Sequence, residues 1–457
     1  MTRIAIIGGG IAGLSAAYYL EKARKGGASL EWTLFEKSDR LGGVLRTEYL
    51  DGYILEAGPD SFLSIKPDAA ALCRELGLGE QIIQSNDHLR KTYILVGRRL
   101  IAIPDGLQFM VPTRIWPMAT TPLFSLGTKI RMARELLTSP RNGSSDESVA
   151  DFVRRHFGQQ MVDRIAEPML AGVYGGNAEQ LSLRAVLPMF AAMEREHGSL
   201  ARATLKARKK SAGAQPQPLF TSLKNGLQQL LEALKPALHQ PWIRMQRPVT
   251  ALRRLNDGWQ IESSGQSENF DTVLLAVPAT SAAALLASIE AEIASRMEKI
   301  QYTASAAVAI AYDKADLPAG FGFLVPGTES RKMMACTFVH NKFSFRAPEG
   351  SALLRCFFSS SRVPDLLKYS EAELEKVALR ELKDILGLEL APRFVRVFRW
   401  SQALPQYETG HLDRVAEIQT RLKALPGLSI IGNSFYGVGI PDCIKSARQA
   451  VERIVAG

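Results

Sequence analysis

Three glycines near the N-terminus have the spacing of a phosphate-binding turn. Residues 4–7 form a short apolar run that predicts a strand. Gly8, Gly10 and Gly13 follow that run at G-x-G-x-x-G spacing, and a helical pattern comes next. In such a turn the first glycine permits the bend, the second lets the backbone approach a pyrophosphate, and the third lets helix and strand pack closely. The helix N-terminus then presents free N–H groups to the phosphates.

A carboxylate follows where the ribose of a dinucleotide would lie. The segment WTLFEK reads as a second strand that ends at Glu36, about twenty residues after the turn. A carboxylate at this point can accept hydrogen bonds from the ribose hydroxyls. The turn and the acid together predict a dinucleotide-binding site rather than a fortuitous glycine turn.

A second glycine loop follows the acid directly and contains Arg40, Gly42 and Gly43. NAD-binding units usually continue directly into helix and strand. A glycine pair at this point resembles the extended FAD fingerprint of the glutathione reductase and amine oxidase superfamily. There the loop runs under the flavin and the arginine nears the phosphates, so the resemblance implies FAD. The alternative is a plain loop with a solvated arginine.

The composition is that of a globular chain that carries excess positive charge. Hydrophobic residues make up 46% and charged residues 22%, which is ordinary for a globular chain, and the length of 457 residues predicts roughly two to four domains. The formal net charge of +10 would suit nucleic acid, anionic lipid or a polycarboxylate ligand. The sequence carries no signature of a nucleic-acid-binding fold, so nucleic acid is not an expected partner.

The cysteines and the apolar segments bear on location. Four cysteines lie far apart without CxxC spacing, which predicts reduced thiols in a cytoplasmic protein and neither a zinc site nor a disulfide framework. Met1 leads directly into a strand, so we expect no signal peptide. No window of about twenty residues is apolar enough to span a bilayer. Peripheral contact with the inner face of the cell membrane stays open as an alternative.

Two middle segments bear on that alternative, and a third segment predicts a helix. Residues 105–140 mix apolar and aromatic side chains with basic ones, which suits a membrane interface if exposed, or an apolar pocket or core if buried. Residues 195–218 are basic and then rich in Ala, Gly, Pro and Gln, typical of a solvated helix end and linker, with lipid headgroup contact as the other reading. Residues 219–238 predict an amphipathic helix.

Six stretches together resemble one enzyme family. They are GGGIAGLSAAYYL, DRLGGVLRT, EAGPDSF, EPMLAGVYGGNAEQLSLRAVLPMF, RWSQALPQYETGHLDRV and GNSFYGVGIPDCIKSARQAVE. In this order and spacing they resemble the FAD-dependent protoporphyrinogen oxidase family of haem biosynthesis. The resemblance covers almost the whole chain. The stretch GPDSF and residues 167–190 most resemble the bacterial, Bacillus-like branch of the family, whose members oxidise coproporphyrinogen III.

The dinucleotide-binding pattern is interrupted and later resumed, which is typical of two-domain flavoprotein oxidases. We therefore expect an α/β fold with a discontinuous Rossmann-like FAD-binding domain, a β-sheet substrate domain, and a helical subdomain that could face a membrane. The expected boundaries are 1–65, 219–292 and 405–457 for the FAD-binding domain, 66–185 for the helical subdomain, and 186–218 with 293–404 for the substrate domain.

The resemblance carries the family's contacts to non-covalent FAD onto residues that lie mostly in glycine-rich turns. These are Gly8, Gly9, Gly10, Ile11, Ala12, Gly13, Glu36, Lys37, Arg40, Gly42, Gly43, Val44, Gly58, Pro59, Asp60, Ser61, Val249, Trp400, Val438, Gly439 and Ile440. Two of these residues have a purely structural alternative: Trp400 could pack in the core, and Asp60 could cap a turn.

The C-terminal stretch GVGIPD repeats the glycine-and-helix pattern without a ribose carboxylate strand after it. We expect Gly437 and Gly439 to let the backbone touch the isoalloxazine. Pro441 suits the first turn of a helix, whose N-terminus would aim positive charge at flavin N1 and O2. Cys443 lies inside this helix and is read as a packing thiol rather than a site of covalent flavin attachment.

The resemblance implies an oxygen-dependent porphyrinogen oxidase that converts coproporphyrinogen III to coproporphyrin III. Hydride would pass from a meso carbon to flavin N5 in successive two-electron rounds, with dioxygen as reoxidant and hydrogen peroxide as product. The sequence names no general base, and His340 and His411 read as structural. The next haem-pathway enzyme is a candidate partner. Oxidation of protoporphyrinogen IX is the alternative. An amine oxidase or carotenoid desaturase on the same scaffold, or a non-enzymatic flavoprotein, is more remote.

The substrate's propionates require cations. In eukaryotic relatives an arginine just after the GP motif helps to hold a propionate, but Leu63 stands at that position here. Lys66 is the nearest base and becomes the candidate, against a solvated lysine.

Overall fold

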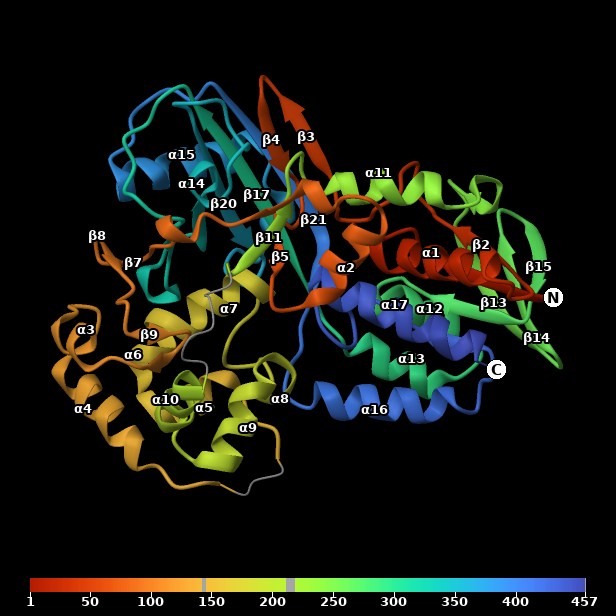
Figure 1. The fold of residues 1–457 in the computed structure, drawn as a ribbon, viewed down its shortest axis with the longest axis horizontal. Helices are drawn as coiled ribbons and strands as arrows, with labels where there is room; N and C mark the ends of the chain where they lie inside the picture. Colours follow the sequence, from red (N-terminus) through yellow and green to blue (C-terminus); the bar gives the residue numbers. More distant parts are fainter. Residues whose placement is uncertain (142–144, 211–217, 457) are drawn as a thin grey trace. The chain divides into compact units, whose positions relative to one another are not determined.

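The computed structural model describes residues 1–141, 145–210 and 218–456, which form two compact units (Figure 1). The first unit comprises Met1–Ser85, Pro218–Gln301 and Leu412–Gly457. The second comprises Asn86–Gln217 and Tyr302–His411. Each unit is therefore assembled from separate segments of the chain.

A five-stranded parallel sheet forms the centre of the first unit, in the order β12-β2-β1-β16-β22. Residues 4–7 of β1 are buried, as expected for a parallel strand that is covered on both faces. The strands are β1 (Thr2–Ile7), β2 (Leu30–Phe35), β12 (Ile243–Arg244), β16 (Thr272–Leu275) and β22 (Leu428–Ile430). The predicted strand, turn and helix at the N-terminus are thus present.

Helices α1 (Ile11–Lys25) and α17 (Ile440–Val455) lie side by side in this unit (Figure 1). Their shared core includes Leu14 and Leu20 of α1 with Ile444 of α17. Two further helices, α2 (Pro67–Glu75) and α11 (Gln228–Ala237), contribute to the same core. The N-terminal turn and the C-terminal turn therefore each lead into a helix of one hydrophobic core.

Smaller elements complete the first unit. The sheets are β3 (Thr47–Leu50) with β4 (Tyr53–Glu56), β5 (Phe62–Leu63) with β11 (Phe220–Leu223) and β6 (Ile82–Gln84), and β13 (Val249–Leu255) with β14 (Gly258–Ser263) and β15 (Gln266–Phe270). The helices are α12 (Ala279–Leu286), α13 (Ala291–Glu298) and α16 (His411–Leu422). The expectation of one helix over 219–238 is wrong, because β11 pairs with two strands and α11 begins only after Gly226, whose φ is +89°.

A seven-stranded sheet forms the second unit's centre, in the order β21-β17-β20-β19-β18-β7-β8. The strands are β7 (Thr92–Val96), β8 (Arg99–Ala102), β17 (Tyr302–Tyr312), β18 (Gly322–Leu324), β19 (Ala335–Phe338), β20 (Ala352–Ser359) and β21 (Phe394–Pro405). Helix α15 (Glu371–Leu386) covers one face, where Leu374 and Leu382 join Val308 and Leu354 in a core. A short helix, α14 (Val339–Lys342), follows β19.

The rest of the second unit is helical, apart from the hairpin of β9 (Leu107–Gln108) and β10 (Val111–Pro112). The helices are α3 (Ile115–Thr120), α4 (Leu126–Arg134), α5 (Val149–Phe157), α6 (Gln159–Met161), α7 (Glu167–Tyr174), α8 (Leu183–Val186), α9 (Pro188–His197) and α10 (Leu200–Lys210), with a π-helical turn (Val162–Ala166) before α7. Their core includes Phe152, Phe157 and Met161.

These units differ from the expected domain boundaries in several places, among them residues 293–301, which lie in the first unit, and residues 405–411, which lie in the second. Residues 66–85 lie in the first unit, because α2 packs on α17 and β6 pairs with β11. Residues 188–210, expected in the substrate domain, join the helical core through Phe190, Leu200 and Ala201. The end of the expected linker, residues 211–217, lies outside the described residues.

Residues 105–140 combine the two readings that the sequence left open. Met118 and Phe124 are buried in the helical core. Ile115, Trp116 and Leu126 are 74–88% exposed. Within 1–141, 145–210 and 218–456, no helix has both the length and the apolar character needed to cross a membrane.

Candidate functional site

The N-terminal turn requires glycine at two positions because backbone atoms crowd it. Gly8 has a φ of +111°, and a Cβ there would lie 2.5 Å from the carbonyl oxygen of Ala276 in the neighbouring strand connection. A Cβ on Gly13 would lie 1.9 Å from the carbonyl oxygen of Gly8. Real Cβ atoms do not approach this closely, so both glycines shape the turn itself.

Gly10 differs from its neighbours because the space beside it is open. Apart from Gly10 and its two chain neighbours, no described residue has a heavy atom within 4 Å of the position that a Cβ on Gly10 would occupy. The first turn of α1 consists of the uncharged residues 11–14, and the early N–H groups of a helix have no partner within that helix. A phosphate can therefore approach the backbone at Gly10 without meeting a side chain there, which fits the predicted pyrophosphate contact.

Glu36 links the turn to the next loop. Its Oε2 accepts a hydrogen bond of 2.7 Å from the Gly9 N–H. Its Oε1 accepts bonds of 2.8 and 2.7 Å from the N–H and hydroxyl of Ser38. The Glu36 carbonyl also accepts the Arg247 N–H at 2.9 Å, which places the start of β13, and so Val249, near the predicted ribose site. The neighbouring Lys37 is exposed.

The second glycine loop lies directly against the first. The Gly42 N–H donates to the Gly9 carbonyl at 2.8 Å, and Gly10 and Gly42 form a parallel bridge. A Cβ on Gly42 would lie 2.2 Å from Cδ1 of Leu231 in α11. A Cβ on Gly43 would lie 3.4 Å from Cα of Gly10. The structure therefore joins the two loops that the sequence assigned to one ligand.

Arg40 holds the second loop in shape. Its guanidinium donates to the carbonyls of Leu41 at 3.3 Å and Leu45 at 3.2 Å, and also to the Gly43 carbonyl. Burial lowers the pKa of Arg40, and the positive charge of Arg46 lowers it further. These contacts give Arg40 a role in the loop, while its expected place near the phosphates stays a prediction.

The next predicted segment touches the second loop. A Cβ on Gly58 would lie 2.0 Å from the Val44 carbonyl oxygen, so these two predicted residues are in contact. After Pro59, the Asp60 carboxylate accepts a hydrogen bond of 2.6 Å from the Ser61 hydroxyl. The chain here is thus folded back on the Val44 backbone.

Glu56 is a positioning residue that the sequence analysis missed. It is buried at the end of β4, where Oε1 accepts the Leu227 N–H at 2.7 Å and Oε2 accepts the Thr47 hydroxyl at 2.9 Å. It therefore fixes the start of α11, the helix whose Leu231 packs on Gly42. An acid inside a short strand, just before the GP pair, was the available signal.

The C-terminal turn has its space filled from within the chain. A Cβ on Gly437, whose φ is +126°, would lie 2.5 Å from Cγ of Asp442. A Cβ on Gly439 would lie 3.0 Å from Asp442 Oδ2, which accepts the Gly439 N–H at 3.2 Å. From the sequence, these glycines were expected to let the backbone approach a flavin. In the structure, the absence of side chains at Gly437 and Gly439 instead makes room for the Asp442 carboxylate. Val438 lies between the two glycines, and Ile440 is buried in the α1–α17 core.

Lys66 pairs with that carboxylate. Its Nζ lies 2.7 Å from both Asp442 oxygens. The sequence analysis did not include Asp442, although an acid in the first turn of a helix is a common N-terminal signal. The expected role of Lys66 toward a propionate stays a prediction.

The remaining predicted residue, Trp400, lies in β21 of the second unit, opposite Ser305 of β17. The two histidines lie in packed surroundings, as expected of structural residues. His340 Nδ1 lies 3.2 Å from the Leu353 carbonyl, and burial lowers the pKa of this imidazole. His411 is buried and stacks on Tyr407 with ring centroids 4.0 Å apart.

Two of the family-like stretches, 167–190 and 399–415, form one hydrogen-bonded assembly. The Gln406 amide donates to the Tyr174 carbonyl at 2.8 Å. The Ser182 N–H donates to the Tyr407 carbonyl at 2.7 Å. Each stretch therefore supplies backbone partners to the other.

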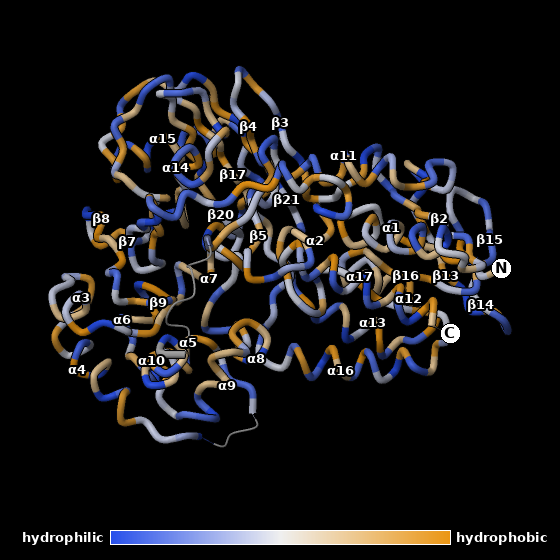
Figure 2. Tube along the Cα trace, viewed as in Figure 1, coloured by the Kyte–Doolittle hydropathy of each residue, from blue (hydrophilic) through white to orange (hydrophobic). Residues whose placement is uncertain are grey.

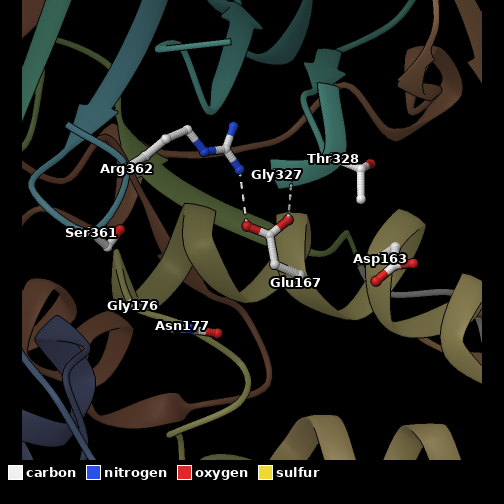
Figure 3. A pocket seen from close by; sticks show the side chains of 8 residues that line it. All are labelled: Asp163, Glu167, Gly176, Asn177, Gly327, Thr328, Ser361 and Arg362. Atoms are coloured by element: carbon white, nitrogen blue, oxygen red, sulfur yellow. Dashed lines mark hydrogen bonds and ion pairs between the residues drawn. The ribbon is translucent and has the colours of Figure 1, made fainter. Parts of the chain in front are cut away.

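A polar cavity of about 420 Å³ lies in the second unit (Figure 3). The Glu167 carboxylate lies 2.9 Å from Arg362 Nη2 and accepts the Gly327 N–H at 3.1 Å. Asp163 adds a second acid to the lining. Two acids against one arginine do not favour a carboxylated ligand, so the cavity is not assigned to the propionates.

Known proteins resemble this chain along almost its whole length and identify its family. The family model for flavin-containing amine oxidoreductases matches residues 11–455. The chain belongs to this family. Within it, the chain is 34% identical to the coproporphyrinogen III oxidase of Bacillus subtilis (strain 168), covering 98% of this chain and 97% of that one. It is 35% identical to the coproporphyrinogen III oxidase of Mycobacterium bovis, covering 98% of this chain and 96% of that protein.

Solved structures agree with the family assignment. A protein from Exiguobacterium sp. 255-15 that carries the name protoporphyrinogen oxidase superposes with a TM-score of 0.89 at 32% identity, over 100% of this chain and 99% of that chain. A reduced UDP-galactopyranose mutase superposes with a TM-score of 0.73 at 16% identity, over 100% of this chain and 96% of that one, which shows the shared fold alone. The expected α/β flavoprotein fold, the family and the oxidoreductase class are confirmed.

Proposed function

We propose that this chain catalyses the FAD-dependent oxidation of coproporphyrinogen III to coproporphyrin III in haem biosynthesis, with dioxygen as acceptor and hydrogen peroxide as product. The supporting observation is full-length similarity, at 31–35% identity, to coproporphyrinogen III oxidases of several bacteria. The turns described above supply a site whose donors and open space suit FAD.

The chain's own residues bind and orient the cofactor in this proposal. The turn from Gly8 to Gly13 would hold the pyrophosphate with those backbone N–H groups that Phe35 and Glu36 do not already accept, and Glu36 would accept from the ribose. Bound FAD would supply the hydride acceptor and react with dioxygen. We expect this binding to be non-covalent, since Cys443 is packed in the core of the first unit and burial raises the pKa of its thiol to about 12.

The choice of substrate is tested by assaying both porphyrinogens, prepared anaerobically, and comparing kcat/KM from porphyrin fluorescence. We expect a clear preference for coproporphyrinogen III. The Exiguobacterium protein's name favours protoporphyrinogen IX as the second candidate. Equal activity, or a preference for protoporphyrinogen IX, would overturn the choice.

Lys66 is proposed as one cation that a propionate meets. Its side chain is 42% exposed beside Asp442, so it keeps a solvent-facing side. Replacing it with Ala should raise KM for coproporphyrinogen III. An unchanged KM would remove Lys66 from substrate recognition.

Peripheral contact with a membrane surface is also proposed. Ile115, Trp116 and Leu126 are exposed in the same segment as the exposed Arg114 and Arg131. Helix α4 alternates between hydrophobic and hydrophilic residues along its length (Figure 2). Such a surface suits anionic lipid.

Sedimentation with vesicles of phosphatidylcholine and phosphatidylglycerol tests this contact. The wild type should co-sediment, and Trp116→Glu should stay in the supernatant. Equal sedimentation of both proteins would contradict the proposal. The next haem-pathway enzyme, which would take up the product, is the proposed protein partner, and co-elution in gel filtration is the measurement.

A further inference from the structure

The ion pair between Lys66 and Asp442 joins the start of α2 to the first turn of α17. Both carboxylate oxygens lie 2.7 Å from the ammonium nitrogen. The Asp442 side chain is 15% exposed, so its charge is largely removed from water. A paired carboxylate of this kind depends on its cation for compensation.

The pair is part of the C-terminal turn itself. Asp442 accepts the Gly439 N–H, and its Cγ occupies the space that a side chain on Gly437 would need. A carboxylate in the first turn offsets the positive end of the helix dipole. The ammonium of Lys66 then offsets the charge of that carboxylate. The net charge at residues 437–442 therefore depends on both side chains.

We propose that the Lys66–Asp442 pair sets the electrostatic environment of the flavin pyrimidine end, and thereby its midpoint potential. The inference rests on the proposed FAD site at residues 438–440. Reduction places negative charge at flavin N1 and O2, so a nearby anion disfavours reduction and a nearby cation favours it. Lys66 and Asp442 are positioning residues that act in opposite directions, and neither is assigned a bond to the reacting atoms.

A second ion pair between the same two helices provides a matched control. Asp68 in the first turn of α2 lies 2.9 Å from Arg448 of α17. The side-chain exposures are 40% for Arg448 and 14% for Asp68, close to 42% and 15% for Lys66 and Asp442. Arg448 lies six residues after Asp442, about 9 Å along the helix axis. The control pair ties the same helices together away from the turn.

The experiment measures the flavin midpoint potential of substrate-free holoprotein against a reference dye. Lys66→Met should lower the ratio of reduced to oxidised flavin about tenfold at fixed dye potential, which is about 30 mV for a two-electron couple. Asp442→Asn should raise that ratio, and the double variant should return close to wild type. Lys66→Arg keeps the charge and should leave the potential unchanged. Asp68→Asn and Arg448→Gln should leave it unchanged as well.

Opposite shifts for Lys66→Met and Asp442→Asn support the inference. Shifts of the same sign, no shift, or equal shifts in the control pair overturn it and leave the pair as a tether between helices. Because the potential is measured without porphyrinogen, a failure here is separate from a failure of the substrate assay. Protein that contains no flavin and takes up no added FAD would overturn both proposals.

Discussion

The two glycine-rich turns of the first unit follow one sequence pattern and differ in what fills them. The N-terminal turn leaves the space beside Gly10 open and leads into a helix whose first turn is uncharged. The C-terminal turn fills the space beside Gly437 and Gly439 with the Asp442 carboxylate, which Lys66 neutralises. One turn leaves room for an anion from outside the chain, and the other already holds one of the chain's own.

This difference shows that a missing side chain has two physical meanings. A glycine can clear a path for a ligand, or it can make room for another residue of the same protein. Spacing alone does not distinguish the two cases, because both need the same residue type before a helix. The contacts that a hypothetical Cβ would make do distinguish them.

The largest effect on stability is expected when a side chain is added to Gly8 in the N-terminal turn. Gly8→Ala places a Cβ 2.5 Å from the Ala276 carbonyl at a φ that disfavours L side chains. We expect a loss of about 3 kcal/mol or more in the free energy of unfolding, together with loss of bound flavin. Urea unfolding and the flavin absorbance of purified protein measure this. A stable, yellow variant would show that the turn relaxes.

Gly10→Ala should separate ligand binding from folding. The added methyl enters open space, and the extended φ of −73° suits alanine, so stability should stay within about 0.5 kcal/mol of wild type. The affinity for FAD should fall about tenfold or more, because the methyl occupies the approach to the phosphate. FMN lacks the adenosine half, so the preference for FAD over FMN should shrink. Unchanged FAD affinity would show that the open space beside Gly10 does not serve the cofactor, and would contradict the contrast drawn between the two turns.

Gly439→Val is the corresponding change in the second turn. Its Cβ would lie 3.0 Å from Asp442 Oδ2 and would disturb the capping carboxylate. We expect FAD binding to weaken about three- to tenfold, or the flavin potential to change, with the preference for FAD over FMN retained. Fluorescence titration with both flavins measures this. A lost preference would mean that this turn also contacts the adenosine half.

The smallest effect is expected at Cys443, next to the carboxylate. Burial raises the pKa of its thiol to about 12, with the Asp442 charge as a further cause, so the thiol stays protonated at pH 8. Iodoacetamide at pH 8 should leave it unmodified in native protein, and acid precipitation should release flavin to the supernatant in both wild type and Cys443→Ala. Flavin that stays in the wild-type pellet but not in the variant pellet would show covalent attachment.

Sequence predicted best where a feature depends on neighbours along the chain. The first strand, the turn at residues 8–13 and Glu36 lie within a short segment whose spacing has few structural solutions. The strand at Phe220–Leu223 was misread as helix because its partners, β5 and β6, lie far away in sequence.

The two site residues that were not predicted, Asp442 and Glu56, also have partners that lie far away in the sequence. Lys66 and Asp442 are separated by 376 positions, and Glu56 and Leu227 by 171. Nothing local to either residue specifies the partner. Residues 105–140 are partly buried and partly exposed, and the sequence left this open because composition cannot say which face of a short helix is buried.

The pairing of α1 with α17 has a consequence during synthesis. Leu14 and Leu20 emerge early from the ribosome, yet Ile444 and the other α17 residues that cover them emerge more than four hundred residues later. At typical translation rates this delay is on the order of a minute or less. The apolar face that α1 presents to α17 therefore stays uncovered until translation nears completion.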